Sequence, residues 1–403
     1  MHARVAPAPP QGGESSVDRQ SGGTVPRLRL VFWELTNGCN LRCQHCRATA
    51  QPGRSPDELD TGAALQIVEQ LAEMGPLVLI LTGGEPLYRP DVFTIARRAA
   101  DKGLHVALAT NGTLVDGATA DAIVAAGVER VSISLDGSNA RTHDSFRGIE
   151  GAFDRALQGF HNLKERGVSL QFNTTVARHN VDELPDIIAL ARRVGADALH
   201  LFMLVPVGCG AQIAETQMLP AQRYEEVLGW LARESQAGDL EVRATCAPHY
   251  YRILRQQRRQ PGTAAGRAPS VPGHPAAGVG ESHGAAAPSA GTELMRSHTR
   301  GCLAGVGVMF ISHTGTVQPC GYLPVEAGNL RQQTVRQVWE ASPVFAALRD
   351  ESRLTGKCGR CPYKHACGGC RARAFYASGD YLAEEPYCIY EPAGRHARAV
   401  QAG

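Results

Sequence analysis

Long apolar runs and an excess of charge of either sign are both missing from this 403-residue sequence. Its apolar stretches, such as residues 76–81, are far shorter than the roughly 20 residues needed to cross a bilayer. Lys and Arg number 41 against 39 Asp and Glu, so the net charge of +2 offers no basic footprint for nucleic acid or an acidic membrane. The first 27 residues lack the basic-then-apolar order of a signal peptide. We therefore expect a cytoplasmic protein with no membrane span and no nucleic-acid partner.

Low-complexity segments mark the borders of the predicted domains. Hydrophobic residues make up 43% and charged residues 20%, which is ordinary globular composition and excludes disorder throughout the chain. Residues 1–27 are rich in Pro, Gly and Ser and predict a disordered tail, and 393–403 predict a second tail. Gly, Ala and Pro dominate 261–292, which predicts a linker or insertion over 256–300. We interpret the histidines in or near it as solvated; these are His274, His283 and His298.

Strand-like and helix-like segments alternate along the first half of the chain. Short apolar runs predict strands at 28–35, 77–81, 106–109, 131–135, 170–175 and 198–205. Apolar residues at helical spacing predict helices at 61–74, 91–102, 118–126, 153–166 and 184–194. This alternation indicates a parallel sheet buried on both faces. About six repeats predict an α/β fold, a partial (β/α)6 barrel within 28–255, followed by a cysteine-rich module at 301–392.

Twelve cysteines are many for a reducing compartment, where thiols more often serve as metal ligands or catalytic groups than as disulfides. Cys39, Cys43 and Cys46 follow the first predicted strand with the spacing C-x3-C-x2-C. Thiolates favour iron–sulfur clusters or zinc, but a structural zinc site needs four ligands and no fourth lies nearby. Three cysteines leave one iron of a [4Fe–4S] cluster open for a substrate or cofactor. The alternatives are a zinc knob or buried thiols.

The first loop and the one after the second strand together resemble the radical S-adenosylmethionine (SAM) enzymes. The shared features are the three cysteines, the run Gly83-Gly84-Glu85-Pro86 and the six-fold strand–helix pattern over about residues 28–210. The resemblance implies that the cysteines form the catalytic [4Fe–4S] site, that the open iron binds SAM, and that a 5′-deoxyadenosyl radical removes a hydrogen atom from a substrate. It also implies that the Gly-Gly-Glu-Pro loop contacts the methionine amino group, although Glu85 could instead order the loop.

Six further positions are implied SAM contacts. By resemblance, His45 lies near the adenine, and Ser134 and Asp136 face the ribose or the carboxylate. Asn111 and Asn173 follow the same pattern, and turn or capping roles are the alternative for them. Arg147 suits a carboxylate, because a guanidinium binds that group in a bidentate manner. A surface salt bridge is the alternative for Arg147.

The C-terminal cysteines resemble the SPASM extension of radical SAM enzymes, which houses auxiliary iron–sulfur clusters. They are Cys302, Cys320, Cys358, Cys361, Cys367, Cys370 and Cys388. A zinc ribbon would use Cys358, Cys361, Cys367 and Cys370 and leave three thiols unexplained. The resemblance instead implies one auxiliary [4Fe–4S] cluster on Cys358, Cys361, Cys367 and Cys388. Cys302, Cys320 and Cys370 would share a second site, for which no fourth cysteine precedes Cys302, so one or two auxiliary clusters are expected.

Longer stretches narrow the resemblance to the heme synthases of the siroheme-dependent alternative pathway. Examples are Trp33-Glu-Leu-Thr36, the run 201–208 and the segment 244–251. That family oxidatively decarboxylates two propionates of iron-coproporphyrin III to vinyl groups, which gives heme b. The resemblance implies an iron-porphyrin substrate and an electron donor such as a flavodoxin or ferredoxin. Cationic groups for the propionates could come from Arg178, Arg243 or Arg252.

Several assignments stay open at the level of sequence. His249 could line the porphyrin cavity, ligate heme iron or be a satisfied core histidine, and Cys246 could be a missing cluster ligand or a buried thiol. Cys209 receives no role. The runner-up function is a SPASM-type maturase that modifies a ribosomally made peptide, although no winged-helix segment precedes the first strand. A non-catalytic iron–sulfur or zinc scaffold is the third class. The oligomeric state does not follow from the sequence.

Overall fold

A computed structural model describes residues 25–259 and 300–392, so most of both predicted tails and of the predicted linker lies outside the described residues. The described part is built around one ten-stranded sheet with the order β10-β9-β8-β1-β2-β3-β4-β5-β6-β7. Its strands are β1 (Leu30–Glu34), β2 (Val78–Thr82), β3 (His105–Thr110), β4 (Arg130–Ser134), β5 (Ser169–Val176), β6 (Ala198–Met203), β7 (Glu241–Thr245), β8 (Val308–Ile311), β9 (Thr316–Gln318) and β10 (Gly328–Asn329). From β8 through β1 to β7 every neighbouring pair is parallel.

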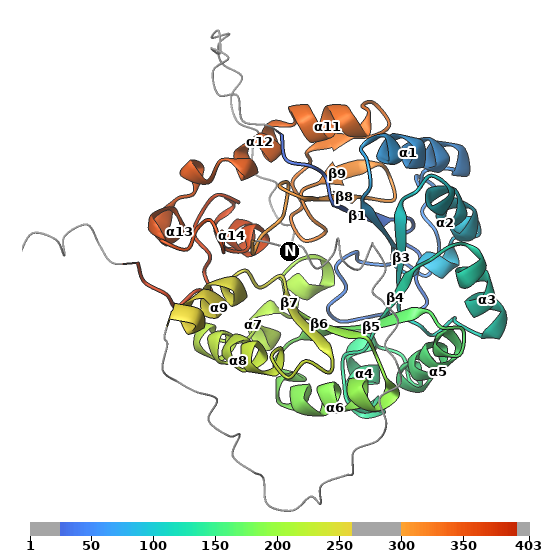
Figure 1. Ribbon diagram of the computed structural model, residues 1–403, viewed down its shortest axis with the longest axis horizontal. Helices are drawn as coiled ribbons and strands as arrows, with labels where there is room; N and C mark the ends of the chain where they lie inside the picture. Colours follow the sequence, from blue (N-terminus) through green and yellow to red (C-terminus); the bar gives the residue numbers. More distant parts are fainter. Residues whose placement is uncertain (1–24, 260–299, 393–403) are drawn as a thin grey trace, which may run out of the picture.

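Helices surround this curved sheet on its outer side (Figure 1). The helices between barrel strands are α1 (Thr61–Glu73), α2 (Val92–Asp101), α3 (Gly117–Ala125), α4 (Ala140–Arg147), α5 (Ala152–Lys164), α6 (Leu184–Val194), α7 (Ala214–Gln217) and α8 (Ala221–Glu234). The later helices are α9 (His249–Arg259), α11 (Val335–Ala341), α12 (Pro343–Arg349), α13 (Gly356–Arg360) and α14 (Arg371–Ser378). No helix among the described residues is long and apolar enough to cross a membrane.

The two faces of the sheet differ because successive side chains of a strand point to opposite sides. Outward side chains such as Trp33, Leu81 and Phe172 are buried in the main core beneath the helices. The inner face carries a small apolar cluster at β1, β2, β3 and β8. Farther along, Ser134 and Asn173 pair in register on β4 and β5. The inner face is therefore polar where the sheet curves round its hollow side.

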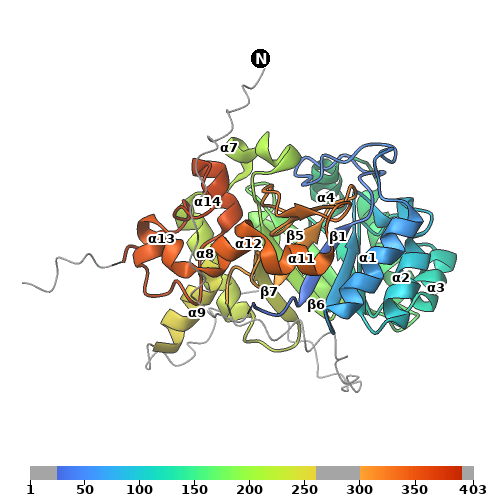
Figure 2. The ribbon, with the colours of Figure 1, turned by 90° about the horizontal axis from the view of Figure 1, so that it is seen from above.

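The C-terminal module continues the barrel sheet instead of standing apart from it. Strand β8 pairs in parallel with β1, Leu30 beside Val308, and then turns back through the antiparallel strands β9 and β10. Helix α11 packs on α1, as Figures 1 and 2 show, and its Trp339 Nε1 donates a hydrogen bond to the Pro26 carbonyl. The module is thus attached through β1, the strand whose end carries the first three cysteines.

The structure contains all six predicted strands and all five predicted helices and confirms the α/β partial-barrel class. It adds β7 and helix α4, which the sequence did not predict. Helix α4 has the polar sequence ARTHDSFR, without the apolar spacing that signals a helix. Its ends are nonetheless well defined, because the Asn139 side chain accepts a hydrogen bond from the Thr142 N–H and Gly148 closes the helix in the left-handed region, at φ 74°.

Candidate active site

The first three cysteines lie in the loop between β1 and α1, at the carboxyl ends of the strands. Figure 2 shows this loop, in blue, at the same edge of the molecule as α4 and α7. The Leu41 N–H donates to Cys39 Sγ over 3.4 Å, and Arg147 Nη1 lies 3.7 Å from Cys43 Sγ. The Cys46 carbonyl accepts a hydrogen bond of 2.8 Å from the Cys209 N–H. Cys209 therefore supports the loop through its backbone.

The environment of these thiols suits a metal cluster. Burial raises the pKa of Cys39 to about 12, and burial also raises the pKa of Cys43. Such thiols become thiolates when a metal displaces their protons. Within residues 25–259 and 300–392, no three His, Cys, Asp or Glu side chains converge closely enough to hold a single metal ion.

The loop after β2 lies directly against the cysteine loop, and this contact requires glycine. The Gly84 N–H donates to the Thr36 carbonyl over 2.7 Å, and the Glu85 N–H donates to the Gly38 carbonyl over 2.8 Å. A Cβ atom on Gly83 would lie 2.7 Å from the Thr36 carbonyl oxygen, and one on Gly84 would lie 2.5 Å from that of Gly38. The two glycines therefore let one backbone approach another.

Glu85 is completely buried and holds the next loop in place. Its carboxylate accepts hydrogen bonds from the Thr110 hydroxyl (2.7 Å), the Asn111 N–H (2.8 Å) and the Leu87 N–H (3.2 Å). Burial raises the pKa of Glu85 to about 7 in spite of these donors. The geometry corresponds to the loop-ordering role, and Pro86 begins a short 3-10 helix, Pro86–Tyr88, immediately after it.

Asn111 connects the loop after β3 to the cysteine loop. Its Nδ2 donates to Asn40 Oδ1 over 2.8 Å and lies 3.9 Å from Cys39 Sγ. Its Oδ1 accepts hydrogen bonds from the Thr113 N–H and hydroxyl, an arrangement typical of a turn. Asn111 therefore has the expected turn geometry and also contacts a predicted cluster ligand.

Asp136 is the centre of a buried charged group behind the cysteine loop. Its Oδ2 lies 2.7 Å from Arg147 Nη2 and 3.2 Å from His45 Nε2, and its Oδ1 accepts a hydrogen bond of 2.7 Å from the Thr175 N–H. Burial alone would raise the pKa of Asp136, but Arg147 and His45 hold it below its ordinary value. Arg147 is 8% exposed, so the surface salt bridge considered for it is excluded.

An aromatic stack extends this group. The His45 ring stacks on Phe146 with the ring centres 4.1 Å apart, and Phe146 stacks on His179 at 4.9 Å. Burial lowers the pKa of His45 to about 4, so its ring is neutral near pH 7. The sequence did not single out Phe146 or Thr175, although Phe146 adjoins Arg147 in the motif that led to that arginine.

Polar side chains form a row across the inner face of four neighbouring strands. The row, in register from β4 to β7, consists of Ser134, Asn173, His200 and Arg243. Asn173 Oδ1 accepts a hydrogen bond of 2.6 Å from Gln171 Nε2, which also lies 3.0 Å from His200 Nδ1. The row lines the hollow side of the sheet, below the edge that carries the cysteine loop.

The three arginines considered for carboxylate binding lie in different places. Arg178 is exposed and donates to the Met218 carbonyl. Arg252 is buried beside Glu225 in the C-terminal half. Arg243 alone of the three lies in the inner row, where its Nε is 2.7 Å from Glu241 Oε1. The structure thus singles out Arg243 as the one placed on the hollow side.

A charged group at the end of β1 connects the cysteine loop to the C-terminal module. Glu34 is buried and accepts hydrogen bonds from Arg47 Nη2 (2.7 Å) and His313 Nδ1 (2.6 Å). Arg47 directly follows Cys46, and its guanidinium lies 4.6 Å from the centre of the Phe310 ring on β8. The first loop and the module therefore share one wall of the site.

Four cysteines of the module line one small cavity, namely Cys358, Cys361, Cys367 and Cys388. Three of their thiols accept backbone hydrogen bonds, from the N–H groups of Glu385 (3.3 Å), Tyr363 (3.4 Å) and Gly369 (3.4 Å). Backbone N–H groups aimed at sulfur are typical of iron–sulfur sites. Cys388 rather than Cys370 completes the group, which differs from the zinc-ribbon alternative.

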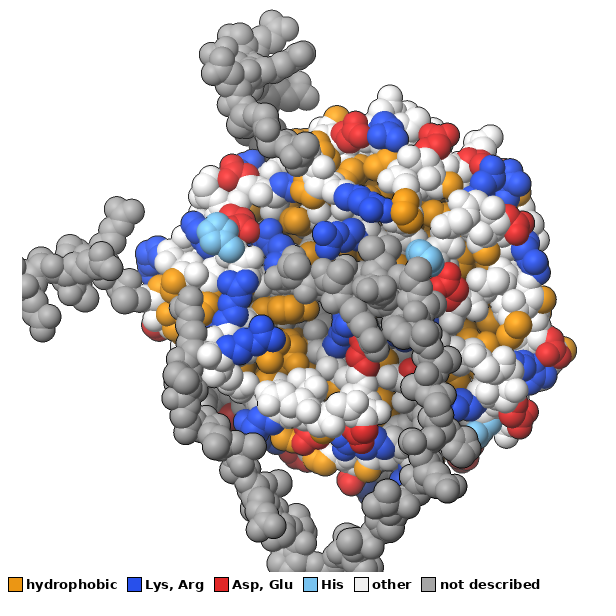
Figure 3. All heavy atoms as spheres, viewed as in Figure 1, with side chains coloured by type: hydrophobic (Ala, Val, Ile, Leu, Met, Phe, Trp, Pro, Cys, Tyr) orange, Lys and Arg blue, Asp and Glu red, His pale blue; other side chains and the backbone are white. Residues whose placement is uncertain are grey.

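The cavity is also lined by three cations, Arg252, Lys357 and Lys364. Figure 3 shows Lys and Arg side chains over the region where α9 and α14 lie in Figure 1. Four thiolates around a cluster carry a net negative charge, which nearby cations offset. The charge of this part of the module therefore fits a cysteine-bound cluster.

The other three cysteines of the module, Cys302, Cys320 and Cys370, lie near Cys246, which belongs to the barrel half of the chain. Cys246 follows β7 and packs with Cys320 against the buried Cys370. Burial, and then the nearby thiols of Cys370, Cys320 and Cys302, raise the pKa of Cys246 well above its ordinary value. Cys246 has φ 54°, and its carbonyl accepts hydrogen bonds from Arg373 Nη2 (2.7 Å) and the Tyr224 hydroxyl (3.2 Å). A second group of four thiols is thus assembled.

Family models and individual proteins match both halves of the chain. The model for the radical SAM superfamily matches residues 33–191, and the model for an iron–sulfur cluster-binding domain matches 302–362. An AdoMet-dependent heme synthase of Methanosarcina barkeri is 48% identical over 90% of this chain and 97% of its own length. One of Oleidesulfovibrio alaskensis is 42% identical over 97% of this chain and 96% of its own. The crystal structure of Streptococcus suis SuiB bound to S-adenosylmethionine superimposes with a TM-score of 0.67 at 14% identity, covering 90% of this chain and 78% of that one.

Proposed function

Because this chain belongs to the radical SAM family of AdoMet-dependent heme synthases, we propose that it converts two propionates of iron-coproporphyrin III into vinyl groups and so forms heme b. The observation that carries the proposal is an identity of 42–48% over at least nine-tenths of both chains. That extent includes the first-loop cysteines as well as the C-terminal module. A similarity limited to the barrel would support SAM cleavage but would not indicate which substrate the protein uses.

The first loop supplies the binding site for the reactive cofactor. Cys39, Cys43 and Cys46 would hold a [4Fe–4S] cluster, which together with SAM supplies the group that abstracts hydrogen. The fixed Asp136 carboxylate and the neutral, stacked His45 ring present a polar and an aromatic surface beside the cysteine loop. Ser134 and Asn173 face the same hollow from neighbouring strands. We propose that these side chains orient SAM.

The substrate chemistry requires an electron acceptor. Each propionate loses a hydrogen atom from its β-carbon, and this hydrogen atom is transferred to form 5′-deoxyadenosine. The remaining carbon radical then loses carbon dioxide and one electron, and its two carbons form the vinyl group. Cys358, Cys361, Cys367 and Cys388 would hold an auxiliary cluster, which would supply an acceptor for that electron. An external carrier such as a flavodoxin or ferredoxin would supply the electron for SAM cleavage.

We propose two auxiliary clusters in this module. Cys358, Cys361, Cys367 and Cys388 line one cavity and would hold the distal cluster. The group consisting of Cys246, Cys302, Cys320 and Cys370 would hold the proximal cluster, nearer β7 and β8. All twelve cysteines are free, which suits the reducing cytoplasm that we propose as the compartment.

An anaerobic assay tests the function. The reconstituted protein is incubated with SAM, dithionite and iron-coproporphyrin III. The products are separated by chromatography and identified by mass spectrometry. Loss of two carboxyl groups together with formation of 5′-deoxyadenosine is expected. A Cys39→Ala variant is the control and should form neither product. Formation of deoxyadenosine without a change in the porphyrin would contradict the proposed substrate and favour a peptide maturase. If cluster-loaded protein formed no deoxyadenosine, the assignment to the radical SAM enzymes would be contradicted.

A further inference from the structure

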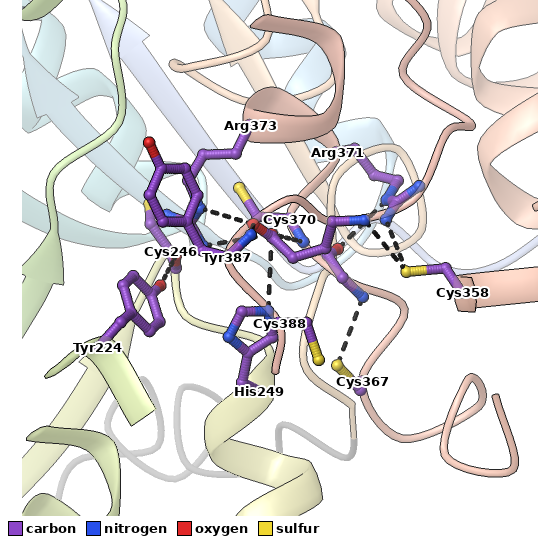
Figure 4. A network of polar contacts seen from close by, with 12 residues as sticks. Tyr224, Cys246, His249, Cys358, Cys367, Cys370, Arg371, Arg373, Tyr387 and Cys388 are labelled. Atoms are coloured by element: carbon purple, nitrogen blue, oxygen red, sulfur yellow. Dashed lines mark hydrogen bonds and ion pairs between the residues drawn. The ribbon is translucent and has the colours of Figure 1, made fainter. Parts of the chain in front are cut away.

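His249, the first residue of α9, is completely buried against the distal group of four cysteines. It lines the same cavity as Cys358, Cys361, Cys367 and Cys388. Figure 4 shows its ring on the same side of the polar network as the thiols of Cys367 and Cys388. His249 is therefore placed among the ligands expected for the distal cluster.

Neither ring nitrogen of His249 has a hydrogen-bond partner among the described residues. Its Nε2 lies 3.8 Å from Glu385 Oε2, which is beyond hydrogen-bonding distance. A buried polar group without a partner costs about 1–3 kcal/mol. His249 is therefore not the satisfied core histidine that the sequence allowed, and its N–H group calls for an acceptor inside the cavity.

Glu385 does not need the histidine as a donor. Its carboxylate already accepts hydrogen bonds from the Cys370 N–H (2.7 Å), Arg373 Nε (3.1 Å) and the Tyr387 N–H (3.2 Å). Arg373 in turn donates to the Cys246 carbonyl over 2.7 Å. The buried Arg373–Glu385 pair contacts both groups of cysteines, because Arg373 and the Glu385 carboxylate bind the backbone of Cys246 and Cys370, and the Glu385 N–H donates to Cys358 Sγ over 3.3 Å.

We propose that His249 donates a ring N–H to a sulfur atom of the distal cluster and thereby sets the reduction potential of that cluster. This inference rests on the proposed occupancy of the distal group by an iron–sulfur cluster. In this role His249 would contact the distal cluster and not the porphyrin.

The chemistry of an imidazole N–H and a cluster sulfur supports a hydrogen bond of this kind. An imidazole ring carries an N–H in both its neutral and its protonated form, so His249 can act as a donor in either state. Thiolate and sulfide sulfurs accept hydrogen bonds, and such bonds draw negative charge from the cluster. Reduction adds negative charge, so the bond favours the reduced state and raises the potential. A higher potential makes the distal cluster a better acceptor for the electron that leaves the substrate.

Redox titration of the full-length holoprotein, followed by electron paramagnetic resonance, tests the inference. The signal of the distal cluster is identified by its loss in a Cys361→Ala variant. His249→Leu removes the donor, whereas His249→Asn and His249→Gln each restore an N–H near one ring nitrogen. His365→Leu is the matched control, because His365 belongs to the same module, its side chain is 73% exposed and it pairs with Glu351.

The expected result is a more negative potential of the distal cluster in His249→Leu, recovery in the Asn or Gln variant, and no change in His365→Leu. Protein labelled with ¹⁵N-histidine should also show a weak nitrogen coupling to the distal cluster that disappears in His249→Gln. An unchanged potential in a cluster-loaded His249→Leu protein would overturn the inference. So would the absence of ¹⁵N coupling in the wild type, which keeps the test decisive if the leucine variant fails to load its cluster. Neither readout requires heme formation, so failure here is distinguishable from failure of the proposed function.

Discussion

The Arg147 guanidinium lies 2.7 Å from the Asp136 carboxylate and, through its other terminal nitrogen, 3.7 Å from the Cys43 thiol. One side chain thus neutralises a buried carboxylate and contacts a predicted cluster ligand. Both partners are almost fully buried, so the pair differs from a solvent-exposed salt bridge, which contributes little. Removing one partner of a buried pair leaves an uncompensated charge.

Arg147→Met is therefore expected to destabilise the protein by about 3–5 kcal/mol, because Asp136 would remain buried and unpaired. Arg147→Lys keeps the positive charge but loses the second contact, so its effect should be smaller. Thermal unfolding under nitrogen measures both variants against the wild type. Equal unfolding midpoints for Arg147→Met and the wild type would contradict this account of the pair.

Gly84→Ala should displace the cysteine loop, because the new Cβ would lie 2.5 Å from the Gly38 carbonyl oxygen and 2.7 Å from that of Asn37. We expect loss of the first-loop cluster and of SAM cleavage. Gly53→Ala is the matched control, since no atom lies within 4 Å of its Cβ position in the same loop. Iron content and deoxyadenosine yield measure the effect, and full activity of Gly84→Ala would show that the loop can move at no cost.

Glu85 predicts a dependence of stability on pH. Burial raises its pKa from 4.5 to about 7, so the folded protein favours the protonated form. Its contribution is fully present below pH 4.5 and is lost as the pH rises through about 7, a difference of about 3 kcal/mol. Glu85→Gln is uncharged at every pH and should flatten this part of the profile. Unfolding midpoints on either side of pH 7 measure the change, and parallel profiles for both proteins would refute it.

Cys246→Ala is expected to lose the iron of the proximal cluster, because Cys246 lies with Cys302, Cys320 and Cys370. Cys209→Ala should keep all of its iron, since the hydrogen bond between Cys209 and the cysteine loop is made by its backbone N–H. Iron and sulfide analysis together with Mössbauer spectroscopy compares the two variants. Equal iron in both would remove Cys246 from the set of ligands.

Cys361→Ala should separate the two halves of the reaction. The first loop is untouched, so SAM cleavage is expected to continue, whereas the distal cluster and the decarboxylated product should be lost. The assay compares deoxyadenosine with vinyl product for this variant and for Cys209→Ala. Full product formation by Cys361→Ala would disprove the role of the distal cluster as electron acceptor.

Local patterns in the sequence were sufficient for the barrel and for the class of chemistry. Each of the six predicted strands is a short run with apolar residues. The run 77–81 is apolar throughout, which reflects burial on both faces, whereas 170–175 alternates with polar residues. The three cysteines of the first loop lie within eight residues, and together with Gly83-Gly84-Glu85-Pro86 they carry the resemblance that implies a cluster site. The assignment of SAM contacts to Ser134, Asp136 and Asn173 stays a prediction.

Polar segments were harder to interpret, because their structure depends on what packs against them. Helix α4 carries few apolar residues, so its helical form and the burial of Arg147 did not follow from periodicity. A buried Asp136 on the neighbouring strand end is what turns Arg147 inward. The choice between a surface ion pair and a buried one therefore required the partner to be known.

The sequence by itself determined the kind of ligands and most of the local elements, since these depend on residues close together in the chain. Tertiary structure alone decided which distant groups meet. Strand β8 pairs with β1, His313 reaches Glu34 across 279 positions, and Cys246 joins the module cysteines from the end of β7. The physical reason is that such contacts depend on how the whole sheet curves and packs, which is a property of the folded chain and not of any short stretch of it.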